Sequence, residues 1–221
     1  MSFENRSAAG RGLAAALAGY VERQPIVLAL PRGGVPVAAE VAAALGAPLD
    51  LILVRKIGVP AQPELAMGAV ADGVAPIVVR NAEIIQHSGV TEMEFNAVRD
   101  AELAEIERRR RRYLGARAHE AVAGRTVIVI DDGIATGATV RTALRAVRAR
   151  GPKELVLAVP VAAKDTLDEL RDEADCIVCL ESPAWLEAVG FFYDDFRQVT
   201  DAEVIATLAR FPRERAPGTI G

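Results

Sequence analysis

Residues 126–144 read TVIVIDDGIATGATVRTAL, and this stretch decides the fold of the chain. Its first five residues are apolar or β-branched, which predicts a buried strand. Two acids, Asp131 and Asp132, follow the strand, and a loop of small residues at 133–139 leads into a helical pattern that opens at Val140. Backbone N–H groups and the positive end of a helix dipole meet in such a loop, so the stretch predicts an anion site.

The composition of the loop narrows the class of ligand. Thr136 and Thr139 add hydroxyl groups, and the small residues allow a phosphate to approach the backbone closely. The two acids would repel a bare phosphate, so they suit a ligand that also brings hydroxyl groups or a hydrated divalent cation. A sugar phosphate meets both demands. The plainer alternative, a strand–turn–helix unit with a capping threonine, leaves the paired acids unexplained.

The run from Val127 to Thr139 resembles the ribose-phosphate-binding motif of the type I phosphoribosyltransferases, in which an apolar strand, two acids and two or three apolar residues precede A-T-G-x-T. The resemblance implies an α/β fold with a doubly wound, mostly parallel sheet and a hood of helical and aromatic segments. It also implies that Asp131 and Asp132 bind the ribose hydroxyls of phosphoribosyl pyrophosphate, directly or through a Mg²⁺ cofactor. By the same resemblance, the 5-phosphate is held by Ala135, Thr136, Gly137, Ala138 and Thr139.

A second strand–loop–helix unit lies near the start of the chain. Residues 26–30 predict the first core strand, the next four read Pro-Arg-Gly-Gly, and a helical pattern follows over 35–45. One arginine and two glycines at a helix entrance again suit an anion. By the resemblance, Arg32 and the amides of Gly33 and Gly34 hold the pyrophosphate. From the residues alone, a tight turn with a surface arginine is the alternative.

Two cations follow the second predicted core strand. This strand covers residues 49–54 and runs into Arg55 and Lys56. In a parallel sheet, these side chains would lie at the carboxyl edge, where ligands bind in open α/β folds. By the resemblance, we expect Lys56 to face the pyrophosphate and to join Arg32 and the two acids in the catalytic set. A solvated strand end is the alternative, and it accounts for Arg55 equally well.

Residues 57–80 are punctuated by Gly58, Pro60 and Pro63 and end in β-rich segments. A segment of this kind between core elements predicts a mobile lid. Family members close such a loop, built between two antiparallel strands, over the active site and thereby exclude water. Glu64 either faces the ligand or lies in solvent.

A long helix is predicted over residues 91–114. Thr91 and Glu94 have the spacing of a capping box at its start. The helix belongs to an insertion at 87–120 relative to the smallest family members. We expect this insertion to form a cover over the site or the contact of a homodimer.

Five consecutive arginines, Arg108 to Arg112, lie in this helix and raise the question of nucleic-acid binding. Five successive residues span more than one helical turn, so they form no single basic face. Glu105 and Glu107 lie four residues before Arg109 and Arg111, the spacing of favourable ion pairs. We therefore expect a solvated helix and no nucleic-acid partner.

Further strands are predicted at 154–159 and 176–180, with a helix at 164–173 between them. The alternation of strands and helices favours a parallel, doubly wound sheet. Cys176 and Cys179 form a C-x-x-C within the last strand, where they face opposite sides. We expect buried thiols there rather than a redox or zinc site.

The segment 181–210 contains the aromatic residues Trp185, Phe191, Phe192, Tyr193 and Phe196, with acids among them. Aromatic planes beside acids suit a flat heterocycle, and many related enzymes bind the nucleobase in a hood built from terminal segments. Packing of these rings onto the sheet explains the same residues equally well.

The composition of the whole chain fits one soluble domain. The 221 residues are 51% hydrophobic and carry a net charge of −4, so no overall basic field suggests nucleic acid. We expect a single domain over 1–221, with its core at about 25–180. No apolar run has the length of a membrane span, and the first residues, MSFENRSAAGRG, contain no hydrophobic signal core. We therefore expect a cytoplasmic protein without membrane contact.

The resemblance implies transfer of ribose 5-phosphate from phosphoribosyl pyrophosphate to a nitrogenous base or similar acceptor. In 6-oxopurine enzymes of the family, an aspartate three residues after the second acid acts on the purine; here that residue is Ala135. Hypoxanthine and guanine are therefore poor candidates, and the sequence does not name the acceptor. The alternatives are a non-catalytic sensor of phosphoribosyl pyrophosphate or nucleotides, an RNA-binding regulator, and a phosphohydrolase that uses the acids as metal ligands.

Overall fold

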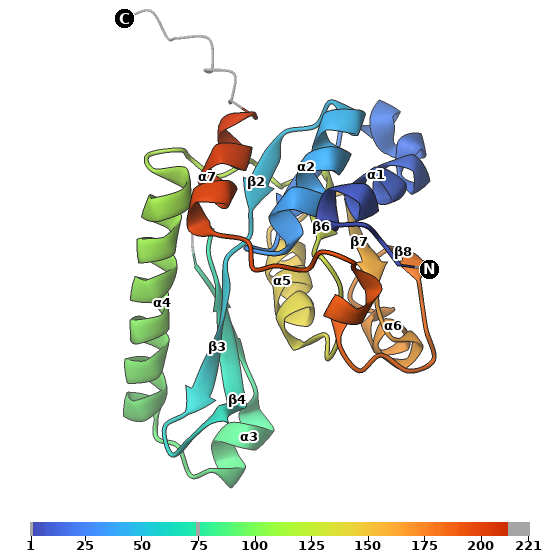
Figure 1. Ribbon diagram of the computed structural model, residues 1–221. Coiled ribbons are helices and arrows are strands. Elements are labelled where there is room, and N and C mark those ends of the chain that lie inside the picture. The colour runs from blue at the N-terminus through green and yellow to red at the C-terminus, as the bar shows by residue number, and fades with distance from the viewer. Residues whose placement is uncertain (1, 74–75, 212–221) are drawn as a thin grey trace, which may run out of the picture.

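The computed structural model describes residues 2–73 and 76–211. Its centre is a sheet of five parallel strands in the order β2-β1-β6-β7-β8 (Figure 1). The predicted doubly wound parallel sheet is therefore confirmed. The strands are β1 (Ile26–Ala29), β2 (Leu49–Leu51), β6 (Thr126–Ile130), β7 (Glu154–Val161) and β8 (Cys176–Glu181).

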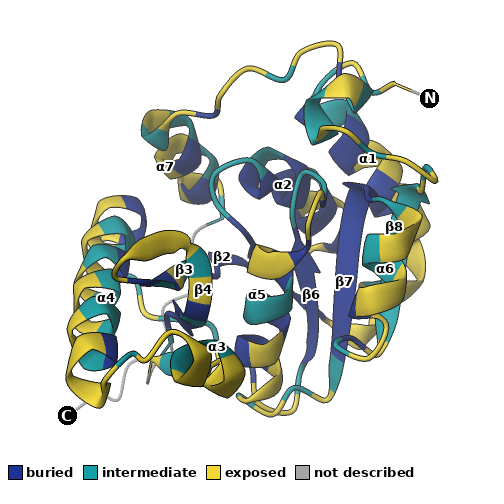
Figure 2. Cartoon of the chain, turned by 90° about the horizontal axis from the view of Figure 1, so that it is seen from below, coloured by how far each residue is buried: buried dark blue, intermediate teal, exposed yellow. Residues whose placement is uncertain are grey.

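Helices cover both faces of this sheet because its strands are apolar on both sides. On β6, Ile128 and Ile130 pack into one core cluster, and Val127 and Val129 pack into another. The first cluster is shared with α1 (Arg6–Ala16) and α2 (Gly34–Leu45), and the second with α5 (Ala138–Arg148) and α6 (Lys164–Leu170). Figure 2 shows β6 and β7 as buried strands within this layered arrangement.

The strand order creates a topological switch point between β1 and β6. In chain order the five parallel strands are arranged 2-1-3-4-5, so the connections leave β1 and β6 in opposite directions. These two strands are direct neighbours, with Ala29 in register with Ile130. The loops that follow them therefore leave the same edge side by side, where ligands bind in open α/β sheets.

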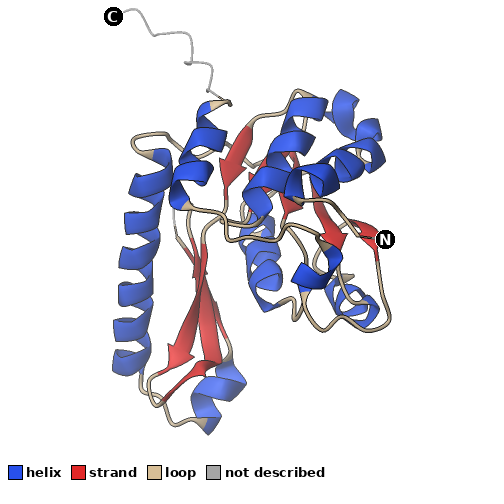
Figure 3. Ribbon diagram, in the orientation of Figure 1, coloured by secondary structure: helices blue, strands red, loops and turns tan. Residues whose placement is uncertain are grey.

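A second, antiparallel sheet projects from the first beside the long helix α4 (Glu92–Leu114), as Figure 3 shows. It consists of β3 (Val54–Val59), β4 (Gln62–Ala71) and β5 (Ile77–Arg80), and the short helix α3 (Ala82–His87) follows it. The antiparallel strands expected around residues 57–80 are present. The connection between β3 and β4 is only two residues long, so most of this segment is strand rather than loop.

The predicted second core strand at 49–54 is wrong in extent. Its pairing with β1 ends at Leu51, and the chain then changes partners. The Ile52 amide still donates to Ala29, but the Leu53 amide donates to the carboxylate of Asp72, and the Asp72 amide donates back to Leu53. This exchange starts the pairing of β3 with β4, so Val54 and the residues after it belong to the second sheet.

The capping box of Thr91 and Glu94 is present at the start of α4. The expected ion pairs on this helix are present as well, with Arg109 Nε 2.7 Å from Glu105 and Arg111 Nε 2.8 Å from Glu107. No helix in 2–73 or 76–211 combines the length and the apolarity needed to cross a membrane.

The N-terminal segment pairs with the segment that follows β8. After β8, the chain passes through a 3₁₀ turn at Val189–Phe192 and ends in α7 (Asp201–Ala209), which contacts α2 and α4. The N-terminal Phe3 forms a β-bridge with Tyr193. A second 3₁₀ segment, Ala18–Arg23, follows α1.

Candidate functional site

The two predicted anion loops are in contact at the switch point. A Cβ atom added to Gly33 would lie 2.0 Å from Oδ2 of Asp132, and one added to Gly34 would lie 2.7 Å from the carbonyl oxygen of Ile130. The Leu30 amide donates to the same carbonyl at 2.9 Å. The glycines are therefore required for the loop after β1 to lie against the acids after β6.

The loop before α5 is anchored by one buried residue, and most of its other residues are exposed to solvent. Ile134 is buried, and its amide donates to Val161 at 2.9 Å. Gly137 has a φ of +74° and caps α5, a conformation that favours glycine. The other members of the predicted phosphate loop are exposed, so they are accessible to a ligand; these are Ala135, Thr136, Ala138 and Thr139.

The first acid of the pair is held by the second. A carboxylate oxygen of Asp131 accepts the amide of Asp132 at 2.9 Å. Burial, together with the neighbouring charge of Asp132, raises the pKa of Asp131 well above the ordinary aspartate range. Asp131 therefore holds a proton more readily than an ordinary aspartate.

The second acid is bound by an arginine that the sequence did not single out. Arg6 Nε donates to Oδ2 of Asp132 at 2.7 Å, and the two side chains are only 10% and 14% exposed. The backbone oxygen of Asp132 accepts the hydroxyl of Tyr193 at 2.6 Å, and burial raises the pKa of that phenol. Arg6 begins an alanine-rich helix, and nothing in the local pattern distinguishes it from a surface arginine.

Arg32 lies in the first loop and points toward α7 and α4. Its Nη1 is 3.5 Å from Oδ1 of Asp201, which also accepts the hydroxyl of Tyr113 at 2.6 Å. The second oxygen of Asp201 is 2.9 Å from Arg112. These donors, Tyr113 first, lower the pKa of Asp201. Asp201 thus ties the predicted pyrophosphate arginine to the end of α4.

Lys56 does not lie at the edge of the parallel sheet. It is on β3, and its Nζ is 3.0 Å from Glu64 across the hairpin. Arg55 is paired with Glu102 of α4 at 2.6 Å. The expected position of Lys56 was wrong because β2 ends at Leu51 and the chain enters the second sheet. Glu64 has a fully exposed side chain in this arrangement.

The rings of the aromatic tail differ in burial. Tyr193 is buried, stacks on Phe196 with ring centroids 4.9 Å apart, and packs near Phe3. Trp185 and Phe191 are 83% and 71% exposed. The packing interpretation is therefore correct for the first pair of rings, and the other two rings are accessible from solvent.

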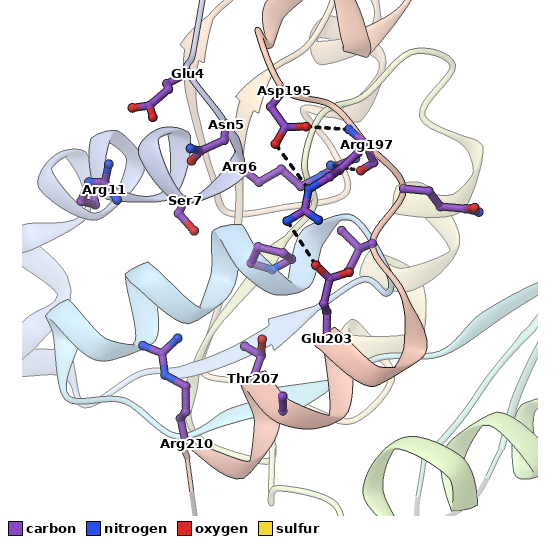
Figure 4. A pocket seen from close by; sticks show the side chains of 14 residues that line it. Glu4, Asn5, Arg6, Ser7, Arg11, Asp195, Arg197, Glu203, Thr207 and Arg210 are labelled. Carbon is purple, nitrogen blue, oxygen red and sulfur yellow. Dashed lines mark hydrogen bonds and ion pairs between the residues drawn. The ribbon is translucent and has the colours of Figure 1, made fainter.

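A polar pocket of about 500 Å³ lies on the other side of Arg6, between α1, α2 and α7 (Figure 4). Arg197 is central in it and forms ion pairs with Asp195 and Glu203. Arg6 and Arg11 also line it. Arg6 therefore separates this pocket from the acid pair.

Within 2–73 and 76–211, no group of three or more His, Cys, Asp or Glu side chains has the arrangement of a metal site. The cysteines of β8 are free thiols and half-buried. Cys176 packs against one core cluster and Cys179 against the other, as expected for a strand.

The chain is similar to known proteins over most of its length. Residues 3–196 match the family described as the phosphoribosyl transferase domain. Two Mycobacterium tuberculosis proteins, from strains H37Rv and CDC 1551, have names that assign them provisionally as phosphoribosyl transferases. Each is 45% identical to this chain over 215 residues, which is 97% of this chain but 48% of the relative. The chain thus spans about half the length of these relatives.

The crystal structure of the Thermus thermophilus protein TT1426 is similar over nearly the whole chain. The two share 40% sequence identity with a TM-score of 0.84, and the match covers 96% of this chain and 99% of that chain.

Proposed function

The chain belongs to the phosphoribosyl transferase domain family, as its sequence motifs predict, and we propose that it transfers ribose 5-phosphate from phosphoribosyl pyrophosphate to a nitrogen nucleophile, releasing pyrophosphate. The observation that carries the proposal is the contact of the two loops at the switch point. Gly33 and Gly34 lie against Asp131 and Asp132, so one ligand can reach both loops. Phosphoribosyl pyrophosphate has anionic groups at both ends of a ribose and suits this arrangement.

In this proposal each loop has a separate task. Residues 135–139 hold the 5-phosphate with backbone amides and threonine hydroxyls at the start of α5. Arg32 and the amides of Gly33 and Gly34 hold the pyrophosphate. As the bond from the anomeric carbon to pyrophosphate breaks, its electron pair leaves with the pyrophosphate, and positive charge develops on the ribose. The negative charge at the acid pair stabilises that state.

The acid pair does not fit a directly bound divalent cation in this arrangement. One oxygen of Asp131 is occupied by the Asp132 amide, and one oxygen of Asp132 is occupied by Arg6. Of the two roles predicted for the acids, direct binding of the ribose hydroxyls therefore enters the proposal, and Mg²⁺ ligation stays an untested prediction. Mg²⁺ on the pyrophosphate itself remains part of the proposal, because it supplies positive charge to that group when bound.

The proposed acceptor is a nitrogenous base other than hypoxanthine or guanine, since Ala135 offers no acid or base to a 6-oxopurine. We assign the segment 181–210, which begins at the last residue of β8, as the hood over the acceptor. Trp185 and Phe191 are the exposed rings in it that are available for stacking.

The test is calorimetric titration of phosphoribosyl pyrophosphate with Mg²⁺, with ribose 5-phosphate and AMP as comparisons. Binding in the micromolar range, followed by acceptor-dependent release of pyrophosphate in a screen of purine, pyrimidine and pyridine bases, is the expected outcome. Binding without release would identify a non-catalytic sensor instead. Failure of all three ligands to bind would overturn the proposal.

A further inference from the structure

We propose that Arg6 is a positioning residue that acts as the built-in counter-cation of the acid pair, so that the ribose 5-phosphate end of the ligand binds without a divalent cation at the acids. This inference rests on the proposed function and specifies how the same site neutralises its own charge.

Arg6 contacts the second acid directly. Arg6 Nε lies 2.7 Å from Asp132 Oδ2, and both side chains are nearly buried. An ion pair that is removed from water is costly to separate, because each charge would remain buried without compensation. The pair is therefore expected to persist when a ligand enters, and a ribose hydroxyl would bind the acid through its other oxygen, Oδ1.

Two further contacts hold the guanidinium of Arg6. Its Nη1 donates to the backbone oxygen of Arg197 at 2.8 Å, and its guanidinium lies 3.9 Å from the centroid of the Phe196 ring. These contacts come from the C-terminal segment and hold the guanidinium in place.

The backbone around Arg6 is fixed as well. Asn5 caps α1 by accepting the amide of Ala8 at 2.9 Å. The amides of Asp194 and Asp195 donate to the carbonyl oxygens of Phe3 and Glu4, each at 2.9 Å. The contacts of the guanidinium and these backbone hydrogen bonds therefore fix the position of the Arg6 charge without a ligand.

Two ionised acids next to a phosphate loop would repel a phosphorylated ligand, which is the difficulty that a divalent cation normally resolves. Here the guanidinium of Arg6 lies 2.7 Å from Asp132 and offsets one of the two negative charges. A ribose phosphate therefore meets less repulsion at the acid pair, and one negative charge remains to face the ribose.

The experiment uses ribose 5-phosphate, which lacks the pyrophosphate and so reports on this end of the site alone. Its affinity for the full chain is measured by calorimetry in EDTA and again with Mg²⁺. The expected result for the wild type is the same dissociation constant, within about twofold, in both buffers.

Three variants complete the test. Arg6→Met removes the charge and keeps an apolar stem, and it is expected to weaken binding in EDTA about tenfold or more, with partial recovery in Mg²⁺. Arg6→Lys keeps the charge and should retain most of the affinity. Arg11→Met, on the same helix and lining the same pocket, is the matched control and should bind like the wild type.

A strict Mg²⁺ requirement of the wild type for ribose 5-phosphate would overturn the inference while leaving the proposed function intact. Undiminished binding by Arg6→Met in EDTA would do the same. If Arg6→Met fails to fold, the wild-type comparison of the two buffers and Arg6→Lys still decide. Absence of binding of both ribose 5-phosphate and phosphoribosyl pyrophosphate to the wild type would overturn the proposed function, and this inference with it.

Discussion

At the scale of single residues, the tightest constraint in the site is the absence of a side chain at Gly33. A methyl group there would lie 2.0 Å from Oδ2 of Asp132, so the loop and the acid would have to move apart. We expect Gly33→Ala to lower the affinity for phosphoribosyl pyrophosphate at least about tenfold and to destabilise the fold by about 1–3 kcal/mol. Calorimetric titration and urea unfolding measure the two effects.

Gly19→Ala is the matched control for this substitution. A Cβ at Gly19 would meet no heavy atom within 4 Å, and the residue is exposed. It should leave both affinity and stability close to the wild type. Equal behaviour of the two alanine variants would show that the loop after β1 does not contact the ligand.

A second residue-scale prediction concerns Asp132. Its place in a loop next to a phosphate site suggests that Asp132→Asn would affect binding and leave stability unchanged. The nearly buried pair with Arg6 changes this expectation. Removing one member of a buried pair costs about 3–5 kcal/mol, and because asparagine keeps an acceptor we expect a loss near the lower end of that range.

The measurement is a double-mutant cycle of urea unfolding with Asp132→Asn, Arg6→Met and the double variant. The double variant should recover part of the stability that each single variant loses, because neither charge is then left alone. Strictly additive losses would contradict a direct coupling between these two residues.

At the scale of elements, most of the parallel sheet could be predicted because β1, β6 and β7 are apolar runs bounded by loops with distinct chemistry. The loop at 31–34 and the loop at 131–139 were found for the same reason, since glycines, acids and threonines follow directly on strands. Their contact follows from the parallel neighbours β1 and β6, whose carboxyl ends share an edge.

The change of partner after Leu51 could not be predicted. Residues 49–54 form one continuous apolar run in the sequence, and what divides it is the exchange of hydrogen bonds between Leu53 and Asp72, nineteen residues apart. Local periodicity carries no information about such a distant partner. The unpredicted change of partner is also why the position of Lys56 was predicted wrongly.

The same Asp72 gives an element-scale prediction of pH dependence. It follows β4, and burial raises its pKa to about 7, against the lowering effects of the Leu53 amide and Arg150. Because the folded state holds this proton more tightly than the unfolded chain, with an ordinary pKa near 4, the contribution to stability is lost as pH rises from about 4 to about 7. The slope in this window is about −1.4 kcal/mol for each pH unit.

Asp72→Asn should remove that dependence and keep an acceptor for the Leu53 amide. We expect the stability of the wild type relative to the variant to fall by about 2 kcal/mol between pH 5.5 and pH 7, and to change little above that. Urea unfolding of both proteins at several pH values provides the measurement. A wild-type-to-variant difference that stays constant from pH 5 to pH 8 would mean that Asp72 is ionised throughout.

At the scale of the whole molecule, an N-terminal and a C-terminal segment converge on the acid pair. Arg6 and the segment 193–197 come from opposite ends of the sequence, and together they enclose Asp132. Such a contact, spanning more than 120 residues, leaves no trace in any local pattern, which is why Arg6 was missed. The phosphate loop, in contrast, is assembled from neighbours in sequence and was found.

The five arginines of α4 permit a whole-molecule prediction about nucleic acid. A chain with a net charge of −4 needs a local basic patch to bind RNA, and the run Arg108–Arg112 is the candidate for one. Each of the five already has a partner within the chain. Arg108 and Arg109 are paired with Glu105, whose pKa their hydrogen bonds lower to about 2; Arg110 bonds to His119, Arg111 to Glu107 and Arg112 to Asp201.

We therefore expect no RNA or DNA binding at physiological salt, and the triple variant Arg108→Gln, Arg109→Gln, Arg111→Gln should behave like the wild type in fluorescence anisotropy with a labelled single-stranded RNA. Arg110 and Arg112 are left in place because they join α4 to the segment after it and to α7. Salt-sensitive binding by the wild type that the triple variant loses would contradict this prediction, because it would require these side chains to leave their acid partners for phosphates. The expected result instead gives α4 a structural role, in which its arginines pair with acids of the same chain. At the C-terminal end of α4, Arg112 shares Asp201 with Arg32 of the proposed pyrophosphate loop.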